Sequence, residues 1–466
     1  MKYRVKNLLC FALVLTGIVS CAFAAKKPNI ILIFSDDAGY ADFGFHGSKI
    51  MRTPRLDSFA EQGMLFKEAY VSAAVCGPSR AGLYTGKYQQ RFGYEENNVP
   101  GYMSLNSTTG DDMGLPLDQK TIGDYMREIG YRTMIIGKWH LGNADRYHPL
   151  KRGFDEFYGF RGGARSFWPY PTSDDVERKE DRIEIGFGKF EEPNKYLTEV
   201  FTDEAINFVE RNQDQPFFLM LCYNAPHTPM HSEKKDLAQF PELTGRRKAL
   251  AGMTLSLDRE CGRLLDQLDE MGLSENTLIV YTNDNGGPSD SNHSVNDPLS
   301  GTKANHLEGG IRVPFLMRWP GVVDENSKFE YPVSTLDLLP TFYAAGGGDV
   351  GNLDGVDGVD LRPFVVGERK GRPHQTLYWK KENRGAIRDG DWKLLRFPDR
   401  PAELYNIAED ISEVNNLANK HPHLVRELYK KLFAWELTLD RPMFQLRREY
   451  EGKAMDRMDK FRKPKL

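Results

Sequence analysis

Short apolar runs alternate with longer stretches of helical periodicity through most of the chain. Four of these runs are continuously hydrophobic, which is typical of buried parallel strands, and they lie at 30–34, 133–136, 217–223 and 278–281. Apolar residues recur at helical spacing in the stretches 117–129 and 248–271. This alternation predicts an α/β fold in which helices flank a mainly parallel sheet.

The rhythm changes after about residue 365, where short strand-like pieces separated by turns replace the longer elements. These pieces lie at 377–379, 385–387 and 392–395. They predict a small antiparallel sheet. A helix is expected to follow at 423–437, because its apolar residues form one stripe.

The same change divides the chain into two parts. We expect a larger domain over residues 25–365 and a C-terminal subdomain, with the small antiparallel sheet and its helix, over residues 366–466. The last residues, 460–466, are basic and are expected to form a solvated tail.

Residues 1–24 have the composition of a signal segment. Three basic residues precede an apolar run from Leu8 to Val19, as in a secretory signal peptide. Cleavage after Ala24 and lipidation of Cys21 both fit the sequence. We therefore expect export, to the periplasm, to the outer membrane as a lipoprotein, or out of the cell.

The formal net charge of -4 does not favour a nucleic acid as partner. Removal of the signal segment takes away three positive charges and would move the charge from -4 to about -7. A protein with this charge that acts on an anion needs a local concentration of positive side chains.

Beyond the signal segment the cysteines are Cys76, Cys222 and Cys261, an odd number that does not predict a disulfide framework.

Each of the four apolar runs is followed by polar or ionisable residues. They are Asp36 and Asp37, Lys138 and His140, His227, and Asp284 and Asn285. Because ligands bind at the carboxyl edge of open α/β sheets, these side chains are expected to share one site. Their carboxylate and amide oxygens suit Ca²⁺, with Mg²⁺ as the alternative.

The string CGPSRAGLYTGK, at residues 76–87, has the features of an anion site at the start of a helix. Pro78 suits the first turn of a helix, where free backbone N–H groups attract an anion. Cys76 and Arg80 are four residues apart and would face the same way. The alternative is a buried free thiol beside a helix start.

The same string resembles the signature of the formylglycine-dependent type I sulfatases, which is Cys-x-Pro-Ser-Arg followed by a Thr-Gly pair. The segments 137–142 and 301–314 resemble further regions of this family, and the resemblance extends from about Asn29 to about Leu417. It implies an alkaline-phosphatase-like fold: a mixed, mainly parallel sheet flanked by helices, with a smaller C-terminal antiparallel sheet and helix.

The resemblance also implies a set of site residues. A formylglycine-generating or an anaerobic sulfatase-maturating enzyme would convert Cys76 to formylglycine, whose hydrate is the nucleophile. One Ca²⁺ would be bound by Asp36, Asp37, Cys76, Asp284 and Asn285. The catalytic residues would be Cys76, Arg80, Lys138, His140, His227 and Lys303. His227 and Lys303 would assist the leaving alcohol, and His140 would take the proton that releases sulfate.

A sulfated carbohydrate is the expected substrate, because the wider sequence resembles bacterial polysaccharide sulfatases of the N-acetylgalactosamine-6-sulfatase-like and carrageenan types. Aromatic faces stack on sugar rings and arginines bind neighbouring sulfates or carboxylates. The candidates for such contacts are Arg146, His148, Arg161, Arg165 and Trp168. The alternative for this segment is packing within an irregular loop.

Two other functions fit parts of this pattern. One is a phosphate or phosphonate ester hydrolase of the same superfamily. The other is a sulfated-glycan-binding protein without catalysis, in which Cys76 is never oxidised.

Overall fold

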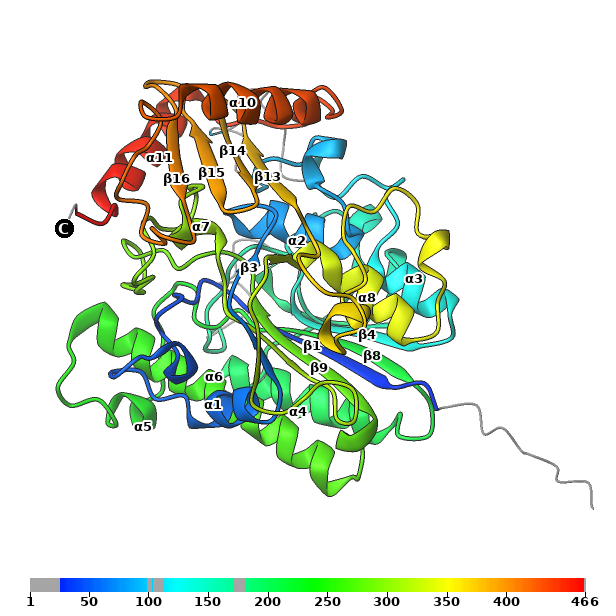
Figure 1. Cartoon of the computed structure of the whole chain (residues 1–466). Coiled ribbons are helices and arrows are strands. Elements are labelled where there is room, and N and C mark those ends of the chain that lie inside the picture. The colour runs from blue at the N-terminus through cyan, green and yellow to red at the C-terminus, as the bar shows by residue number, and fades with distance from the viewer. Residues whose placement is uncertain (1–25, 99–102, 104–111, 171–180, 465–466) are drawn as a thin grey trace, which may run out of the picture.

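The computed structural model describes residues 26–98, 103, 112–170 and 181–464 (Figure 1). The predicted signal segment 1–24, with the candidate lipid anchor Cys21, lies outside the described residues. Within the described ranges, no helix combines the length and the apolar character needed to cross a bilayer.

A mixed sheet of ten strands forms the centre of the molecule, in the order β11-β2-β10-β9-β1-β8-β4-β5-β6-β7. Its central strands are parallel to one another: β9 (Thr277–Asn283), β1 (Asn29–Ser35), β8 (Phe217–Cys222), β4 (Arg132–Lys138) and β5 (Glu156–Phe160). The outer strands are β11 (Ser327–Phe329), β2 (Met64–Phe66), β10 (Phe315–Arg318), β6 (Ile183–Ile185) and β7 (Lys189–Glu191). Because β10, β6 and β7 join antiparallel, the sheet is mixed, and the predicted fold class is confirmed.

Helices cover both faces of this sheet (Figure 1). One face carries α1 (Pro54–Glu61), α4 (Leu197–Glu210) and α6 (Gly245–Glu270), and the other carries α2 (Cys76–Thr85), α3 (Ile122–Glu128) and α8 (Leu338–Ala345). Along β1, Ile31 and Ile33 join the core on the first face, whereas Ile30 and Leu32 join the core on the second. Burial on both faces explains why the strands are continuously hydrophobic.

The helix predicted at 117–129 begins later than expected, at Ile122. Thr121 and Asp124 form a reciprocal capping box, in which each side chain accepts a hydrogen bond from the other residue's backbone N–H. These bonds satisfy free N–H groups at the helix start and fix the boundary.

The small C-terminal sheet is antiparallel and has four strands: β13 (Thr376–Lys381), β14 (Arg384–Asp389), β15 (Trp392–Arg396) and β16 (Glu403–Asn406). The three predicted strands are confirmed, and β16 is additional. Helix α10 (Pro422–Glu436) matches the predicted helix and packs on β14 and β15.

The prediction of a solvated basic tail is wrong for the residues that the structure describes. Helix α11 (Arg448–Lys460) precedes residues 461–464, and its Met455 and Met458 are buried. The backbone N–H of Lys463 donates to Ser300 Oγ, so the tail is docked on the larger domain.

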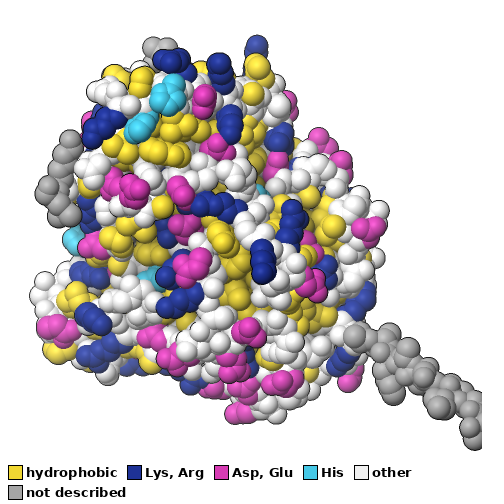
Figure 2. Space-filling model, in the orientation of Figure 1, with side chains coloured by type: hydrophobic (Ala, Val, Ile, Leu, Met, Phe, Trp, Pro, Cys, Tyr) yellow, Lys and Arg dark blue, Asp and Glu magenta, His cyan; other side chains and the backbone are white. Residues whose placement is uncertain are grey.

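On the face shown in Figure 2, acidic and basic side chains are interspersed.

Candidate active site

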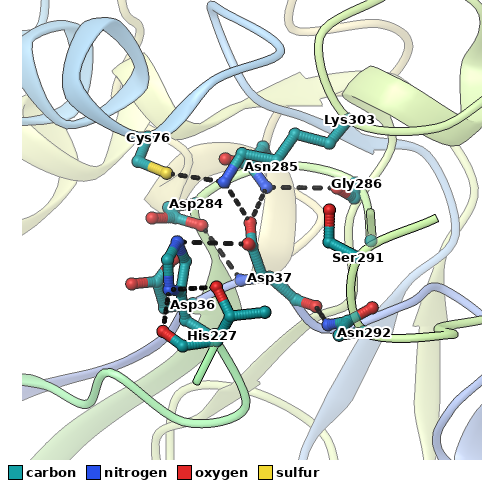
Figure 3. A network of polar contacts seen from close by, with 12 residues as sticks. Asp36, Asp37, Cys76, His227, Asp284, Asn285, Gly286, Ser291, Asn292 and Lys303 are labelled. Carbon is teal, nitrogen blue, oxygen red and sulfur yellow. Dashed lines mark hydrogen bonds and ion pairs between the residues drawn. The ribbon is translucent and has the colours of Figure 1, made fainter. Parts of the chain in front are cut away.

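Neighbouring strands of the sheet end at one place, and each delivers polar side chains to it (Figure 3). Strand β1 leads to Asp36 and Asp37, and β9 leads to Asp284 and Asn285. Strand β4 ends at Lys138. The structure thus brings together the side chains that the sequence placed after separate strands, at the carboxyl edge of the sheet.

Cys76 is the first residue of α2 and is 1% exposed. Lys303 Nζ lies 2.9 Å from Cys76 Sγ and 2.6 Å from Asp37 Oδ1, between the thiol and the carboxylate (Figure 3). Burial alone would raise the pKa of the thiol, but the charges of Lys138 and Lys303 outweigh it and lower the pKa of Cys76 to about 7. The position therefore lies in a positive local field, within a protein whose net charge is negative.

Arg80 and Lys138 belong to the same charge cluster and are fully buried. Arg80 donates to Asp284 Oδ2 at 3.0 Å and to the carbonyl oxygen of Lys138 at 3.0 Å. Lys138 Nζ donates to Asp36 Oδ2 at 2.5 Å. Buried charges of this kind are stable only when they are paired, so these cations and carboxylates hold one another in place.

His227 faces the carboxylates from the loop after β8. Its Nε2 lies 3.4 Å from Asp37 Oδ2, and its Nδ1 lies 2.6 Å from the carbonyl oxygen of Thr228. A carbonyl oxygen only accepts, so Nδ1 carries a proton and Nε2 is the atom that faces the site. Burial lowers the pKa of His227, but Asp36 and Asp37 outweigh burial and raise it. His227 is therefore suited to donate a proton.

His140 has the opposite character. It is buried, and its pKa lies well below the usual value because of burial and because Lys138 and Arg80 are close. The neutral imidazole is suited to accept a proton. Its backbone has a φ of 59°, which is a left-handed conformation. The backbone N–H of His140 donates to the carbonyl oxygen of Arg161, and this hydrogen bond helps to hold the conformation.

Gly163 sets the position of the His140 ring. A methyl group at Gly163 would lie 2.5 Å from His140 Nε2, closer than such atoms can approach. The substitution Gly163→Ala is therefore expected to displace the ring and to lower kcat about 10- to 100-fold. Gly351→Ala is the control, because its methyl group would contact the exposed side chain of Asp349, nearest at Oδ1, 3.2 Å away. Unchanged turnover in Gly163→Ala would mean that His140 has no role in the reaction.

The carboxylates of the site are arranged to hold a cation. Ligand atoms from Asp36, Asp37, Cys76 and His227 lie within 4.8 Å of one another. Two buried oxygens at this place, Asp36 Oδ1 and Asn285 Oδ1, have no hydrogen-bond partner among the described residues. Buried oxygens without donors are what a hard cation with oxygen ligands would bind, and Ca²⁺ fits this donor set.

Repulsion between the carboxylates also favours a bound cation. Burial and the neighbouring charge of Asp36 raise the pKa of Asp284 to about 6, although Arg80 opposes the shift. Arg80, Lys138 and Lys303 already pair with the three carboxylates, yet the pKa of Asp284 stays raised, so a bound cation would lower the repulsion that remains. Asp36, Asp37, Asp284 and Asn285 therefore fit the metal site expected from the sequence.

The predicted substrate contacts fall into two groups. His148, Arg161 and Arg165 are buried. Arg161 pairs with Glu184 at 2.7 Å, and His148 Nε2 lies 3.4 Å from the same carboxylate. Ion pairs of this kind are what the alternative, packing within the loop, predicts. By contrast, Arg146 and Trp168 are partly exposed, Trp168 to 39%.

Two asparagines of the site were not among the predicted residues. Asn97 Oδ1 accepts from the backbone N–H of Gly77 at 2.8 Å, next to Cys76. Asn292 Nδ2 donates to the carbonyl oxygen of Asp37 at 2.9 Å, and Asp37 has a left-handed φ of 64°. Both contacts join segments far apart in the sequence, and neither asparagine stands in a motif that would have marked it.

Comparison with known proteins shows the family to which the chain belongs. Residues 28–348 match the family described as Sulfatase, and residues 303–437 match the family described as N-sulphoglucosamine sulphohydrolase, C-terminal. The N-acetylgalactosamine-6-sulfatase of Canis lupus familiaris is 32% identical over 392 residues, which cover 80% of this chain and 73% of that protein. The steryl-sulfatase of Homo sapiens is 29% identical over 461 residues, which cover 80% of this chain and 77% of that protein.

A similar solved structure is that of Ps i-CgsB in complex with k-i-k-neocarrahexaose. It is 36% identical in sequence and superposes with a TM-score of 0.83. The alignment covers 93% of this chain and 98% of that chain. The similarity therefore includes the large sheet and the C-terminal subdomain together.

Proposed function

The chain belongs to the sulfatase family and is a sulfuric ester hydrolase, and from this premise we propose that it removes sulfate from a carbohydrate with a formylglycine nucleophile at position 76 and one Ca²⁺. The observation that carries the proposal is the place of Cys76. It begins α2 inside the sulfatase signature, with Lys303 Nζ 2.9 Å from its sulfur and a carboxylate cluster beside it. The thiol stands in for the aldehyde that a maturation enzyme would make from it.

Charge neutralisation is the first task of the site, because a sulfate ester is an anion that repels an anionic nucleophile. Arg80, Lys138 and Lys303 provide fixed positive charge around position 76, and all three are held by carboxylates. Ca²⁺, when bound by Asp36, Asp37, Asp284 and Asn285, would add positive charge at the sulfate oxygens. The formylglycine hydrate would supply the hydroxyl group that attacks sulfur, its proton would pass to Asp284 or Asp37, and the bond from sulfur to the sugar oxygen would break.

Proton transfers are assigned by the opposite characters of the two histidines. His227 has a raised pKa and presents Nε2 to the site, so it is the proton donor for the leaving alcohol, together with Lys303. His140 has a lowered pKa and is the base that takes a proton from position 76 when sulfate is released.

A carbohydrate is the proposed leaving group. Two of the similar proteins, N-acetylgalactosamine-6-sulfatase and Ps i-CgsB with its bound neocarrahexaose, have names that refer to sugars. Trp168 and Arg146, the exposed members of the predicted set, are the residues that could contact the sugar. The proposal includes export and maturation by a formylglycine-generating or anaerobic sulfatase-maturating enzyme, with a lipid anchor at Cys21 as one form.

The test is release of inorganic sulfate from sulfated galactan and glycosaminoglycan oligosaccharides by matured protein with Ca²⁺. Aryl sulfate, phosphate monoester and phosphonate monoester are assayed beside them. The proposal predicts that kcat/KM for a sulfated sugar exceeds that for both phosphorus esters. Faster cleavage of a phosphorus ester would favour the phosphohydrolase alternative. Tight binding of sulfated sugars by matured protein without any sulfate release would make the chain a binding protein.

A further inference from the structure

The loop that carries Lys303 has no helix or strand of its own. Residues 297–307, here called the Lys303 loop, form turns and bends that lead into α7 (Glu308–Ile311). Lys303 Nζ is nevertheless held within hydrogen-bond distance of both Cys76 Sγ and Asp37 Oδ1. A reacting group on an irregular loop depends on its surroundings for position, and a displacement of about 1 Å can lower a rate about 100-fold.

The inner side of the loop is bound to the larger domain. Thr302 Oγ1 donates to the carbonyl oxygen of Gly287 at 2.9 Å, and Ala304 N–H donates to the carbonyl oxygen of Ala74 at 2.8 Å. Ala74 lies two residues before Cys76, so this contact sets the loop against the start of α2. The outer side of the loop faces the C-terminal subdomain.

The C-terminal tail binds that outer side through its backbone. The carbonyl oxygen of Phe461 accepts from Gly301 N–H at 2.8 Å, and Lys463 N–H donates to Ser300 Oγ at 2.9 Å. The ammonium group of Lys463 also pairs with Asp297. These contacts hold Asp297, Ser300 and Gly301, which precede Lys303 in the loop.

Helix α11, which precedes the tail, packs against the larger domain. Its Met455 and Met458 are buried in the same apolar cluster as Leu307 and Ile311, which follow Lys303 in the chain. Apolar burial holds the helix on the larger domain. The tail is therefore anchored next to the loop.

The turn after β16 provides a second set of contacts. Ser300 Oγ donates to the carbonyl oxygen of Ser412 at 2.5 Å, and Ser412 Oγ donates to that of Pro298 at 2.7 Å. Glu413 Oε2 accepts from Glu308 N–H at 2.6 Å, at the far end of the loop. Lys393 is fully buried and lies 2.8 Å from the carboxylates of both Glu308 and Glu413, which fixes this end further.

We propose that Ser412, Glu413, Phe461 and Lys463 form a C-terminal clamp that positions Lys303 for catalysis. The clamp takes part in the reaction through the lysine and does not need to touch the substrate. This inference rests on the proposed function, because it assigns Lys303 to the leaving group. Ser300 is the residue through which it is best tested, since its hydroxyl accepts from the tail and donates to Ser412, and its loss leaves no unpaired charge.

The experiment is a double-mutant cycle in the matured full-length chain, with Ser300→Ala, Lys303→Ala and the pair assayed for sulfate release. Ser300→Ala is expected to lower kcat about tenfold and to change KM less than about twofold. In the Lys303→Ala background, Ser300→Ala is expected to change kcat less than about twofold, because residues that act through one group are not additive. The control is Ser256→Ala, which removes a buried hydroxyl on α6 that accepts a hydrogen bond from Arg259 at 3.2 Å.

Hydrogen exchange provides a readout that does not depend on turnover. The Gly301 and Glu308 amides, which donate to the clamp, are expected to exchange faster in Ser300→Ala than in the unchanged chain. Equal losses of kcat in both backgrounds would overturn the proposal, and so would unchanged kcat in Ser300→Ala. If the unchanged chain releases no sulfate, the proposed function fails instead, and the exchange rates still report whether the clamp holds the loop.

Discussion

Replacing Cys76 by alanine is expected to lower kcat for sulfate ester hydrolysis by about 10⁴-fold or more, since the substitution removes the nucleophile itself. Cys76 begins α2 and lies where Lys303 and the carboxylate cluster converge. Binding of a sulfated sugar is expected to persist, because Arg80, Lys138 and Lys303 keep their charges. The measurement is single-turnover sulfate release, with affinity from calorimetry.

Cys261→Ala is the matched control for this variant. Cys261 is also a fully buried thiol, but it lies on α6 and packs among apolar residues. Its substitution is expected to change stability by about 1 kcal/mol or less and to leave kcat within about twofold. Substantial turnover in Cys76→Ala would contradict the assignment of the nucleophile, whatever the control shows.

Removing divalent metal is expected to lower activity by at least about 100-fold, and adding Ca²⁺ is expected to restore it. The physical reason is the pair of buried oxygen atoms Asp36 Oδ1 and Asn285 Oδ1. Neither atom accepts a hydrogen bond from a described residue, so a bound cation would satisfy both. The same site predicts stabilisation by the ion, about 2.7 kcal/mol when free Ca²⁺ is 100 times its dissociation constant. The measurement is the midpoint of thermal unfolding during a Ca²⁺ titration, beside the activity.

Asn285→Ala separates the ion's effect from a general loss of stability. The variant loses one neutral oxygen and is expected to weaken Ca²⁺ binding about 10- to 100-fold, seen as a shift of the titration to higher Ca²⁺. Asn212→Ala is the control, because Asn212 is also buried and hydrogen-bonded but lies at the end of α4. A Ca²⁺ titration that is the same in Asn285→Ala and in the unchanged chain would place the ion elsewhere.

The elements that local patterns determine could be predicted from the sequence. The central strands β1, β4, β8 and β9 appear as continuous apolar runs because both faces of each strand are buried. Their polar endings predicted a shared site because parallel strands present their carboxyl ends at one edge. Glu308 and Arg312 form an ion pair at 3.3 Å, which their spacing of four residues also permits.

The rest of the site depends on contacts between segments distant in the sequence. Nothing near Gly163 indicates that His140 lies against it, and nothing in the tail indicates that Lys463 binds Ser300. The basic residues of the tail were interpreted as solvated because a local pattern does not show a docking partner 163 residues away. The same holds for Arg161, whose partner Glu184 lies on β6, an antiparallel strand between β5 and β7 that was not predicted.

The most direct test of the account is the mass of the peptide that spans Cys76, taken from protein made in a host with a maturation enzyme. Conversion of the thiol to the aldehyde lowers the mass by about 18 Da, because sulfur and two hydrogens leave and one oxygen is gained. The account predicts this loss at Cys76 and unchanged masses for the peptides with Cys222 and Cys261. A thiol that stays intact at Cys76, in a host shown to mature another sulfatase, would contradict it.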